Sequence, residues 1–207
     1  MFERHQPMKE NSTPVRKTKV IVLSGPSGVG KTTLCNRIVE IRDDIKYSIS
    51  ATSRPKRPGE KHGREYYFYT ETDFKKSIAL NMFVEYAEVH GHLYGTPKKF
   101  LENMLDQRFH VIMDVDVHGA RSLMDEYPYP EGLYFFIIPP DIAELERRLR
   151  QRNTDPTDEI KNRLATAREE LKYRTDYQFV IENRDLEQTL EQILETIDRE
   201  TVQQDGS

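Results

Sequence analysis

Apolar residues along the chain alternate between strand-like runs and segments with helical spacing. Short runs rich in β-branched and aromatic residues have the length of buried strands and lie at 19–24, 110–115, 132–138 and 178–181. Apolar residues recur every three or four positions in the segments 31–41, 141–152, 159–173 and 186–199. Such alternation predicts an α/β fold in which helices cover both faces of a parallel sheet.

Capping residues support the starts of two of these helices. Asp141 stands three residues before Glu144, and Asp185 stands three residues before Gln188. This spacing lets an N-cap side chain bind the backbone of the first helical turn. We therefore expect helices to begin directly after Asp141 and Asp185.

Residues 48–96 break the alternation of strands and helices. The segments 65–70 and 83–95 have the residue types of strands, and we expect them to be antiparallel. Between them, Thr70 and Asp73 have the spacing that caps a short helix. We interpret 48–96 as a mostly-β subdomain inserted in the α/β core.

Composition and charge exclude several classes of function. The 207 residues carry a net charge of -4, which argues against general nucleic-acid binding. The longest apolar runs are strand-sized, far short of the ~20 residues of a membrane helix. With no signal-type run near Met1 and Cys35 as the only cysteine, we expect a cytoplasmic protein without disulfides or a membrane partner. Residues 1–17 lack any period and predict a flexible extension. The sequence indicates no oligomeric state.

A glycine-rich loop connects the first predicted strand to the first helix. The stretch GPSGVGKTT fits the pattern G-x-x-x-x-G-K-[ST] and comprises Gly25, Pro26, Ser27, Gly28, Val29, Gly30, Lys31, Thr32 and Thr33. Glycines let successive N–H groups turn toward phosphate oxygens, and the helix N-terminus adds a positive dipole. Lys31 would reach the terminal phosphates of a nucleotide, and the Thr32 hydroxyl would bind Mg²⁺.

Two aspartates follow the second buried strand. Asp114 and Asp116 lie where P-loop folds hold a carboxylate linked to Mg²⁺, near the C-terminal end of a strand. The alternative for each is a cap of the next turn. Together they favour a metal-linked role for at least one.

The stretch SISATSRPKRPGEKHGREYYFYT, residues 48–70, concentrates basic and aromatic residues. Arg54 and Arg57 lie three apart in a proline-stiffened loop, and paired guanidinium groups match the geometry of one phosphate. A nucleic-acid surface or a solvated loop are the alternatives. The balancing Glu60 and Glu65 argue against a surface that neutralises many phosphates.

These residues carry a resemblance to a known family. Residues 52–68, TSRPKRPGEKHGREYYF, match every fixed position of the guanylate kinase signature, and the glycine loop stands the expected distance upstream. The similarity extends over roughly residues 18–198. It implies a P-loop nucleoside monophosphate kinase that transfers the γ-phosphoryl of ATP to GMP with Mg²⁺, in purine nucleotide metabolism and GMP recycling.

The resemblance also implies roles for individual residues. The clamp on the GMP phosphate falls on Arg54, Arg57, Tyr66 and Tyr94. The guanine contacts fall on Ser50, Glu85 and Thr96, and Asp116 is assigned to the GMP side while Asp114 joins Thr32 at Mg²⁺. The transition-state arginines fall on Arg148, Arg152 and Arg163, which with Lys31 and Arg54 form the catalytic set, and Asn183 falls on the adenine side.

The implied organisation is one kinase domain over 18–207. Its core would comprise 18–47, 97–140 and 174–200, with the GMP-binding insertion at 48–96 and an arginine-bearing lid at 141–173. Two alternatives are a peptide-binding scaffold of the same fold and a kinase of another phosphorylated metabolite. The intact glycine loop and clamp argue against the scaffold, and the guanine-contact set argues against another acceptor.

Overall fold

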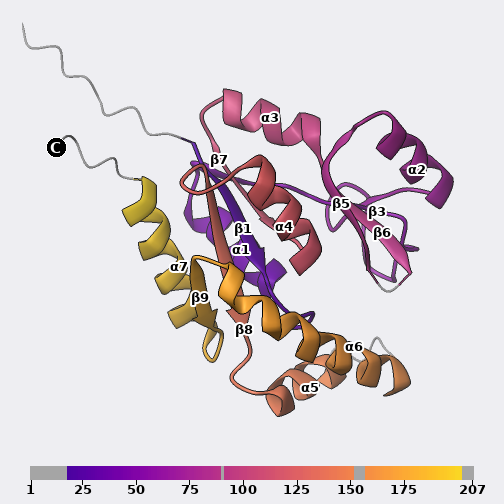
Figure 1. Ribbon diagram of the computed structural model, residues 1–207, viewed down its shortest axis with the longest axis vertical. Helices are drawn as coiled ribbons and strands as arrows, with labels where there is room; N and C mark the ends of the chain where they lie inside the picture. The colour runs from indigo at the N-terminus through magenta and orange to yellow at the C-terminus, as the bar shows by residue number, and fades with distance from the viewer. Residues whose placement is uncertain (1–17, 90, 152–156, 202–207) are drawn as a thin grey trace, which may run out of the picture.

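The computed structural model describes residues 18–89, 91–151 and 157–201 (Figure 1). The predicted N-terminal extension lies outside these residues. The first half of the chain forms β1 (Val20–Ser24), α1 (Lys31–Ile41), β2 (Ile45–Tyr47), β3 (Ala51–Thr52), β4 (Tyr67–Phe68), α2 (Glu71–Ala79), β5 (Phe83–Val89), β6 (His92–Pro97) and α3 (Lys98–Asp106). The second half forms β7 (His110–Asp114), α4 (Val117–Glu126), β8 (Gly132–Ile138), α5 (Ile142–Gln151), α6 (Thr157–Glu170), the 3-10 helix η1 (Leu171–Asp176), β9 (Phe179–Glu182) and α7 (Leu186–Thr201).

The core is a five-stranded parallel sheet with the order β2-β7-β1-β8-β9. The central strand β1 pairs with β7 so that Leu23 lies opposite Asp114. The carboxyl ends of parallel strands meet at one edge of a sheet. The glycine loop after β1 and the aspartates after β7 are therefore neighbours.

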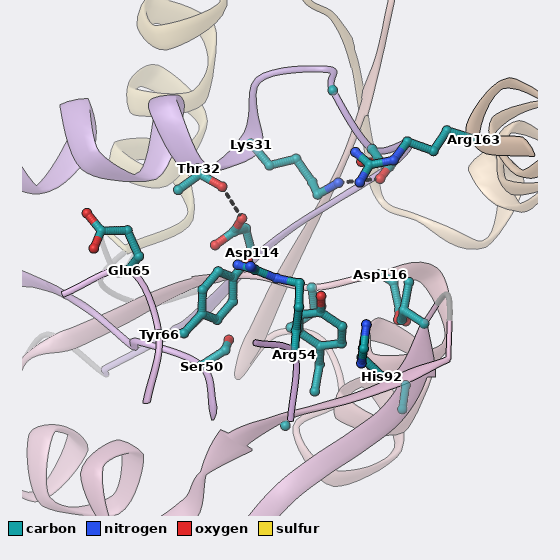
Figure 2. A pocket seen from close by; sticks show the side chains of 18 of the residues that line it. Lys31, Thr32, Ser50, Arg54, Glu65, Tyr66, His92, Asp114, Asp116 and Arg163 are labelled. Carbon is teal, nitrogen blue, oxygen red and sulfur yellow. Dashed lines mark hydrogen bonds between the residues drawn. The ribbon is translucent and has the colours of Figure 1, made fainter. Parts of the chain in front are cut away.

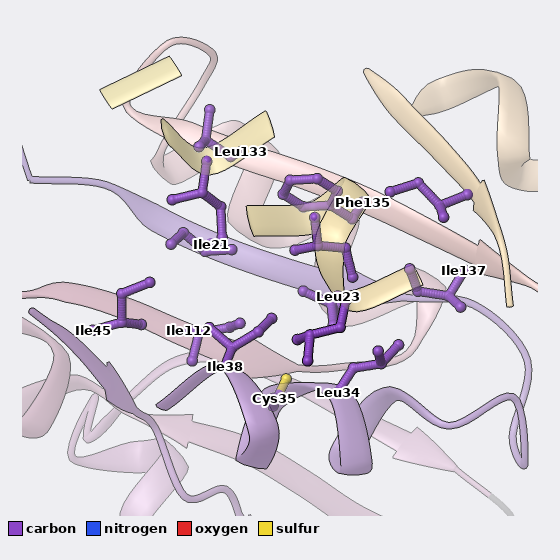
Figure 3. Packing of buried hydrophobic residues seen from close by; sticks show 14 of the residues in the cluster. Ile21, Leu23, Leu34, Cys35, Ile38, Ile45, Ile112, Leu133, Phe135 and Ile137 are labelled. Atoms are coloured by element: carbon purple, nitrogen blue, oxygen red, sulfur yellow. The ribbon is translucent and has the colours of Figure 1, made fainter. Parts of the chain in front are cut away.

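Side chains alternate between the two faces of this sheet. Ile21 and Leu23 of β1 pack on one face with α1 and α7, as Figure 3 shows for part of this cluster. Val20 and Val22 pack on the other face with α3 and α4. The predicted parallel sheet with helices on both faces is confirmed (Figure 1).

The second sheet has the order β4-β3-β6-β5 and lies beside the core, with α2 against it (Figure 1). The antiparallel pair within 83–95 is confirmed by β5 and β6. The antiparallel strand predicted at 65–70 is wrong: only Tyr67 and Phe68 form a strand, and it runs parallel to β3. The short β3 lies between β4 and β6 in the sheet. The loop after β3 brings the chain back to the start of the sheet, so β4 runs in the same direction as β3.

The predicted caps are confirmed. Asp141 Oδ1 accepts a hydrogen bond from the Glu144 N–H at 2.7 Å, and Asp185 Oδ1 accepts one from the Gln188 N–H at 3.0 Å. Thr70 caps α2 in the same way. The helix predicted at 159–173 instead ends at Glu170 and continues as η1. No helix within the described ranges has both the length and the apolar character needed to cross a bilayer.

Candidate active site

The glycine loop bends tightly around the end of β1. Gly25, Gly28 and Gly30 all have positive φ, which glycine adopts without strain. A β-carbon on Gly25 would lie 2.2 Å from the Ile137 carbonyl oxygen of the adjacent strand β8. Only glycine therefore allows the loop to cross β8 this closely and to place the first turn of α1 at the site.

Lys31 begins α1 and folds back over the loop. Its ammonium donates hydrogen bonds to the carbonyl oxygens of Gly25 and Pro26, the latter at 3.1 Å. Figure 2 shows Lys31 on the same side of the pocket as Arg163, which extends from α6. A cation at this place, beside loop N–H groups and a helix N-terminus, suits a polyphosphate.

Asp114 joins the loop side to the edge of the sheet. Its Oδ2 accepts a hydrogen bond from Thr32 Oγ1 at 2.6 Å (Figure 2). Its Oδ1 accepts one from the Tyr47 hydroxyl. The described residues contain no group of three or more His, Cys, Asp or Glu that could hold a metal ion. A hydroxyl and one carboxylate fit Mg²⁺, because this ion retains water and takes substrate phosphate oxygens as further ligands.

Asp116 caps α4. Its Oδ1 accepts hydrogen bonds from the backbone N–H groups of His118 and Gly119, both at 2.8 Å. The capping alternative therefore holds for this aspartate. Asp116 also lines the cavity, so its assignment to the GMP side stays a prediction.

The loop after β3 is held together by Glu60. One oxygen of Glu60 lies 2.7 Å from Arg54 Nη2, and the other accepts the Arg57 N–H at 2.7 Å. Arg54 also stacks over Tyr66, with its guanidinium carbon 5.4 Å from the ring centroid. Burial raises the pKa of Glu60, but the hydrogen bonds from Arg54 and Arg57 outweigh burial and hold the pKa below its usual value. Glu60 thus fixes the side chain of Arg54 and the backbone of Arg57 at the cavity wall.

A buried carboxylate forms the far wall of the cavity. Glu85 on β5 is 6% exposed, and its Oε1 accepts a hydrogen bond from Thr96 Oγ1 at 2.6 Å. Burial raises the pKa of Glu85 to about 7, although the hydrogen bond from Thr96 favours the charged form. Ser50 is buried nearby and lines the same cavity. The carboxylate of Glu85 and the hydroxyl of Ser50 could form hydrogen bonds with a planar ligand that carries polar groups at its edge.

The predicted lid arginines occupy different positions. Arg163 lines the cavity and pairs with Glu159 at 3.1 Å. Arg148 is not among the residues that line it: its guanidinium binds Glu144 at 2.7 Å and the Asn183 carbonyl oxygen at 3.0 Å. Arg152 lies outside the described residues.

Asn183 binds the backbone of the glycine loop through its side chain. Its side-chain amide donates to the Val29 carbonyl oxygen at 2.8 Å and accepts from Thr189 Oγ1 at 3.2 Å. The side chain is buried and is not among those that line the cavity. Its adenine-side role stays a prediction, and its contact in the structure is with the loop backbone.

One cavity of about 1190 Å³ brings most of the predicted residues together. Of the predicted site residues it is lined by Gly25, Ser27, Gly28, Gly30, Lys31, Thr32, Ser50, Arg54, Arg57, Tyr66, Glu85, Tyr94, Asp114, Asp116 and Arg163. Pro26, Val29, Thr33 and Thr96 are not among its lining residues. The cavity is continuous from the glycine loop to the wall at Glu85.

Comparison with known proteins identifies this arrangement. Residues 17–200 match the family model described as Guanylate kinase. The chain belongs to the guanylate kinase family. It is 41% identical over 174 residues to a guanylate kinase of Caldanaerobacter subterraneus subsp. tengcongensis, and the match covers 84% of each chain. It is 44% identical over 173 residues to the guanylate kinase of Carboxydothermus hydrogenoformans, again over 84% of each chain.

A solved structure agrees with the fold. The crystal structure of guanylate kinase from Anaplasma phagocytophilum superposes with a TM-score of 0.77 at 32% identity, over 91% of this chain and 89% of that chain. The predicted P-loop nucleoside monophosphate kinase fold is confirmed, and so is the resemblance drawn from the motifs. The family consists of kinases that phosphorylate GMP at the expense of ATP.

Glu60, Tyr47 and Glu170 line the cavity and are among the lining residues that the predicted site lacks. Glu60 was interpreted only as a balancing charge, although it occupies a fixed acidic position of the family signature. Tyr47 gave no sequence signal, because its contact with Asp114 joins β2 to β7. Glu170, at the end of α6, also lines the cavity, and burial raises its pKa while nearby Lys31 opposes the rise.

The raised pKa of Glu85 predicts a pH dependence of GMP binding. The resemblance assigns the guanine donors to Glu85, and only the carboxylate accepts hydrogen bonds with both oxygens. Binding of GMP should therefore weaken as pH falls through 7 and Glu85 takes up a proton. Between pH 8 and pH 6 we expect the Kd for GMP to rise by about tenfold from this group. Calorimetric titration across this range measures it.

The Glu85→Gln protein is the control, because the phosphate of GMP also titrates near pH 6. In this variant the titration of the GMP phosphate still affects the Kd, whereas residue 85 has no group that titrates. Identical pH profiles in the two proteins would show that Glu85 does not titrate on binding.

Proposed function

We propose that this chain transfers the γ-phosphoryl group of ATP to GMP and releases ADP and GDP, with Mg²⁺ on the donor phosphates. The observation that carries the proposal is the continuous cavity, with the glycine loop and Lys31 at one end and Arg54 and Glu85 at the other. A phosphate cradle facing a second, base-sized polar pocket suits transfer between two nucleotides.

The donor side would consist of the glycine loop and its neighbours. Loop N–H groups and Lys31 would bind the β- and γ-phosphates of ATP. Thr32 and Asp114, which are joined by a 2.6 Å hydrogen bond, would hold Mg²⁺ directly or through water. The ion, when bound, neutralises charge that develops on the transferred phosphoryl group and on the leaving ADP.

The acceptor side would bind GMP by its two ends. Arg54, Arg57, Tyr66 and Tyr94 would bind the phosphate, since guanidinium groups and tyrosine hydroxyls donate to its oxygens. Guanine has adjacent N–H donors that one carboxylate can accept and a carbonyl oxygen that hydroxyls can bind. Glu85 would accept the donors, and the Ser50 hydroxyl would donate to the carbonyl oxygen. Thr96, which is not among the lining residues, would support the site by its hydrogen bond to Glu85.

The chemical step requires no covalent intermediate. An oxygen of the GMP phosphate attacks the γ-phosphorus, the bond from that phosphorus to the β–γ bridging oxygen breaks, and ADP leaves with the electron pair. The protein contributes alignment of donor and acceptor and stabilisation of equatorial charge. Lys31, at the loop end of the cavity, and Arg163, which also lines it, would provide that charge. Arg148 would join them if α5 moves toward the nucleotides, and Arg152, to which the resemblance gives the same role, lies outside the described residues.

A coupled assay of ADP release tests the proposed function. Purified protein, ATP and Mg²⁺ are supplied in turn with GMP, AMP, CMP, UMP, IMP and a sugar phosphate. We expect GMP to be phosphorylated with by far the highest kcat/KM, because a buried site built to pair with one base rejects others by large factors. Turnover of the sugar phosphate, or no turnover of any acceptor, would contradict the proposal.

Arg57 should affect the acceptor and not the donor. Replacing Arg57 by Ala removes a charge-assisted phosphate contact, so we expect the KM for GMP to rise about ten- to a hundredfold while the KM for ATP changes little. Steady-state kinetics with each substrate varied in turn measures both constants. The matched control is Lys56→Ala, which removes the same charge at an exposed neighbouring position. Equal effects of Arg57→Ala on both substrates would remove Arg57 from the acceptor clamp.

Glu85 should distinguish GMP from IMP, which lacks the exocyclic amine. Glu85→Gln keeps the volume but turns one acceptor into a donor that faces a donor of guanine. We expect kcat/KM for GMP to fall by roughly thirty- to a thousandfold, the equivalent of about 2–4 kcal/mol, and that for IMP to fall less. Parallel kinetics with the two acceptors gives the ratio. If the ratio stays at its wild-type value, Glu85 does not bind the amine.

A further inference from the structure

Gly119 lies directly against the carboxylate of Glu85. A β-carbon on residue 119 would lie 2.6 Å from Glu85 Oε2 and 3.2 Å from Glu85 Cδ. A carbon and an oxygen that are not bonded need more than 3 Å, so no side chain fits at 119 while the carboxylate keeps its place. Gly119 belongs to α4 of the core, whereas Glu85 belongs to β5 of the second sheet.

The carboxylate, and not the helix, would move in response to a side chain at this position. Gly119 is fixed by its N–H bond to Asp116, and α4 is anchored by the buried residues Val117, Ala120 and Leu123. The two closest atoms to the added carbon belong to the tip of Glu85, a side chain with rotatable bonds. The next atom, Val115 Cβ, lies at an ordinary contact distance of 3.4 Å.

The helix itself gives no reason for a glycine at this position. Gly119 has no positive φ, so alanine can adopt its backbone conformation. Within a helix, glycine is less stable than alanine by roughly 0.5–1 kcal/mol. The close approach to Glu85 is the contact that an alanine would disturb.

We infer that Gly119 is a specificity-determining positioning residue, which sets where the Glu85 carboxylate lies in the acceptor pocket. The inference rests on the proposed role of Glu85 toward guanine. The backbone of α4 at Gly119 limits by steric contact where Oε2 can lie, while the hydroxyl of Thr96 donates a hydrogen bond to Oε1. The carboxylate is thus oriented by a hydrogen bond at one oxygen and by the shape of α4 at the other.

The test is the Gly119→Ala protein. A displaced carboxylate should lower kcat/KM for GMP by about tenfold or more and narrow the preference for GMP over IMP, while the KM for ATP stays near its wild-type value. The thermal midpoint should be unchanged or higher, because alanine favours the helix. Ser122→Ala, at an exposed position of the same helix, is the control for helix propensity and should leave the kinetics unchanged.

A double-mutant cycle distinguishes repositioning from a general defect. Glu85→Asp shortens the side chain by one methylene group, so the added methyl group should cost less activity in that background than in wild type. A loss from Gly119→Ala that is the same in both backgrounds would overturn the inference. The inference would also be overturned if Gly119→Ala lowers the thermal midpoint and reduces kcat/KM for GMP and for ATP by equal factors. If Gly119→Ala alone does not fold, the comparison of Glu85→Asp with Glu85→Asp/Gly119→Ala decides, since steric relief should restore folding.

Failure of the inference differs from failure of the proposed function. If Glu85→Gln leaves the GMP-to-IMP ratio unchanged, the guanine assignment fails and the inference falls with it. If Glu85→Gln changes that ratio and Gly119→Ala does not, only the role of Gly119 is overturned.

Discussion

The parallel pairing of β1 with β7 is the constraint on which the site depends. It places Leu23 opposite Asp114, so the glycine loop and the aspartate strand end at the same edge of the sheet. Thr32, in the first turn of α1, then reaches Asp114 at 2.6 Å. Both strands are buried on two faces by the helices around them, so a shift of one residue would exchange the residues between the two faces and misplace the loop.

The acceptor pocket depends on a contact between two parts of the fold. Glu85 comes from the second sheet, and Gly119 and Asp116 come from the start of α4 in the core. Asp116 fixes the first turn of α4 by two hydrogen bonds to N–H groups, which in turn fixes Gly119 beside the carboxylate. A cap in the core therefore helps to shape a pocket in the neighbouring sheet.

The sequence predicted those parts of the structure that depend on interactions between residues close together in the chain. Strands with continuous apolar runs, the glycine loop and the helices after Thr70, Asp141 and Asp185 were predicted correctly, whereas α4, which Asp116 caps, was not predicted. The pairing of β4 was wrong because it depends on β3, a strand of two residues without a pattern of its own. Contacts that join distant segments, such as Tyr47 with Asp114 or Gly119 with Glu85, leave no periodic trace, and motif position alone does not reveal that Arg148 binds Glu144 and a backbone carbonyl.

In the proposed acceptor site, selectivity between bases would follow from the burial of Glu85 more than from the number of contacts. Glu85 is 6% exposed and has a pKa raised to about 7, so the protein already bears the cost of keeping an acceptor out of water. A base that presents two donors recovers that cost by pairing with the carboxylate, whereas a base that presents an acceptor leaves it buried and unmatched. The phosphate end differs, because the Glu60 carboxylate compensates the charge of Arg54 across a contact of 2.7 Å. In the proposed site, the Arg54 side chain of the phosphate clamp would therefore be preorganised, and discrimination between bases would fall to Glu85 and the residues that hold it in place.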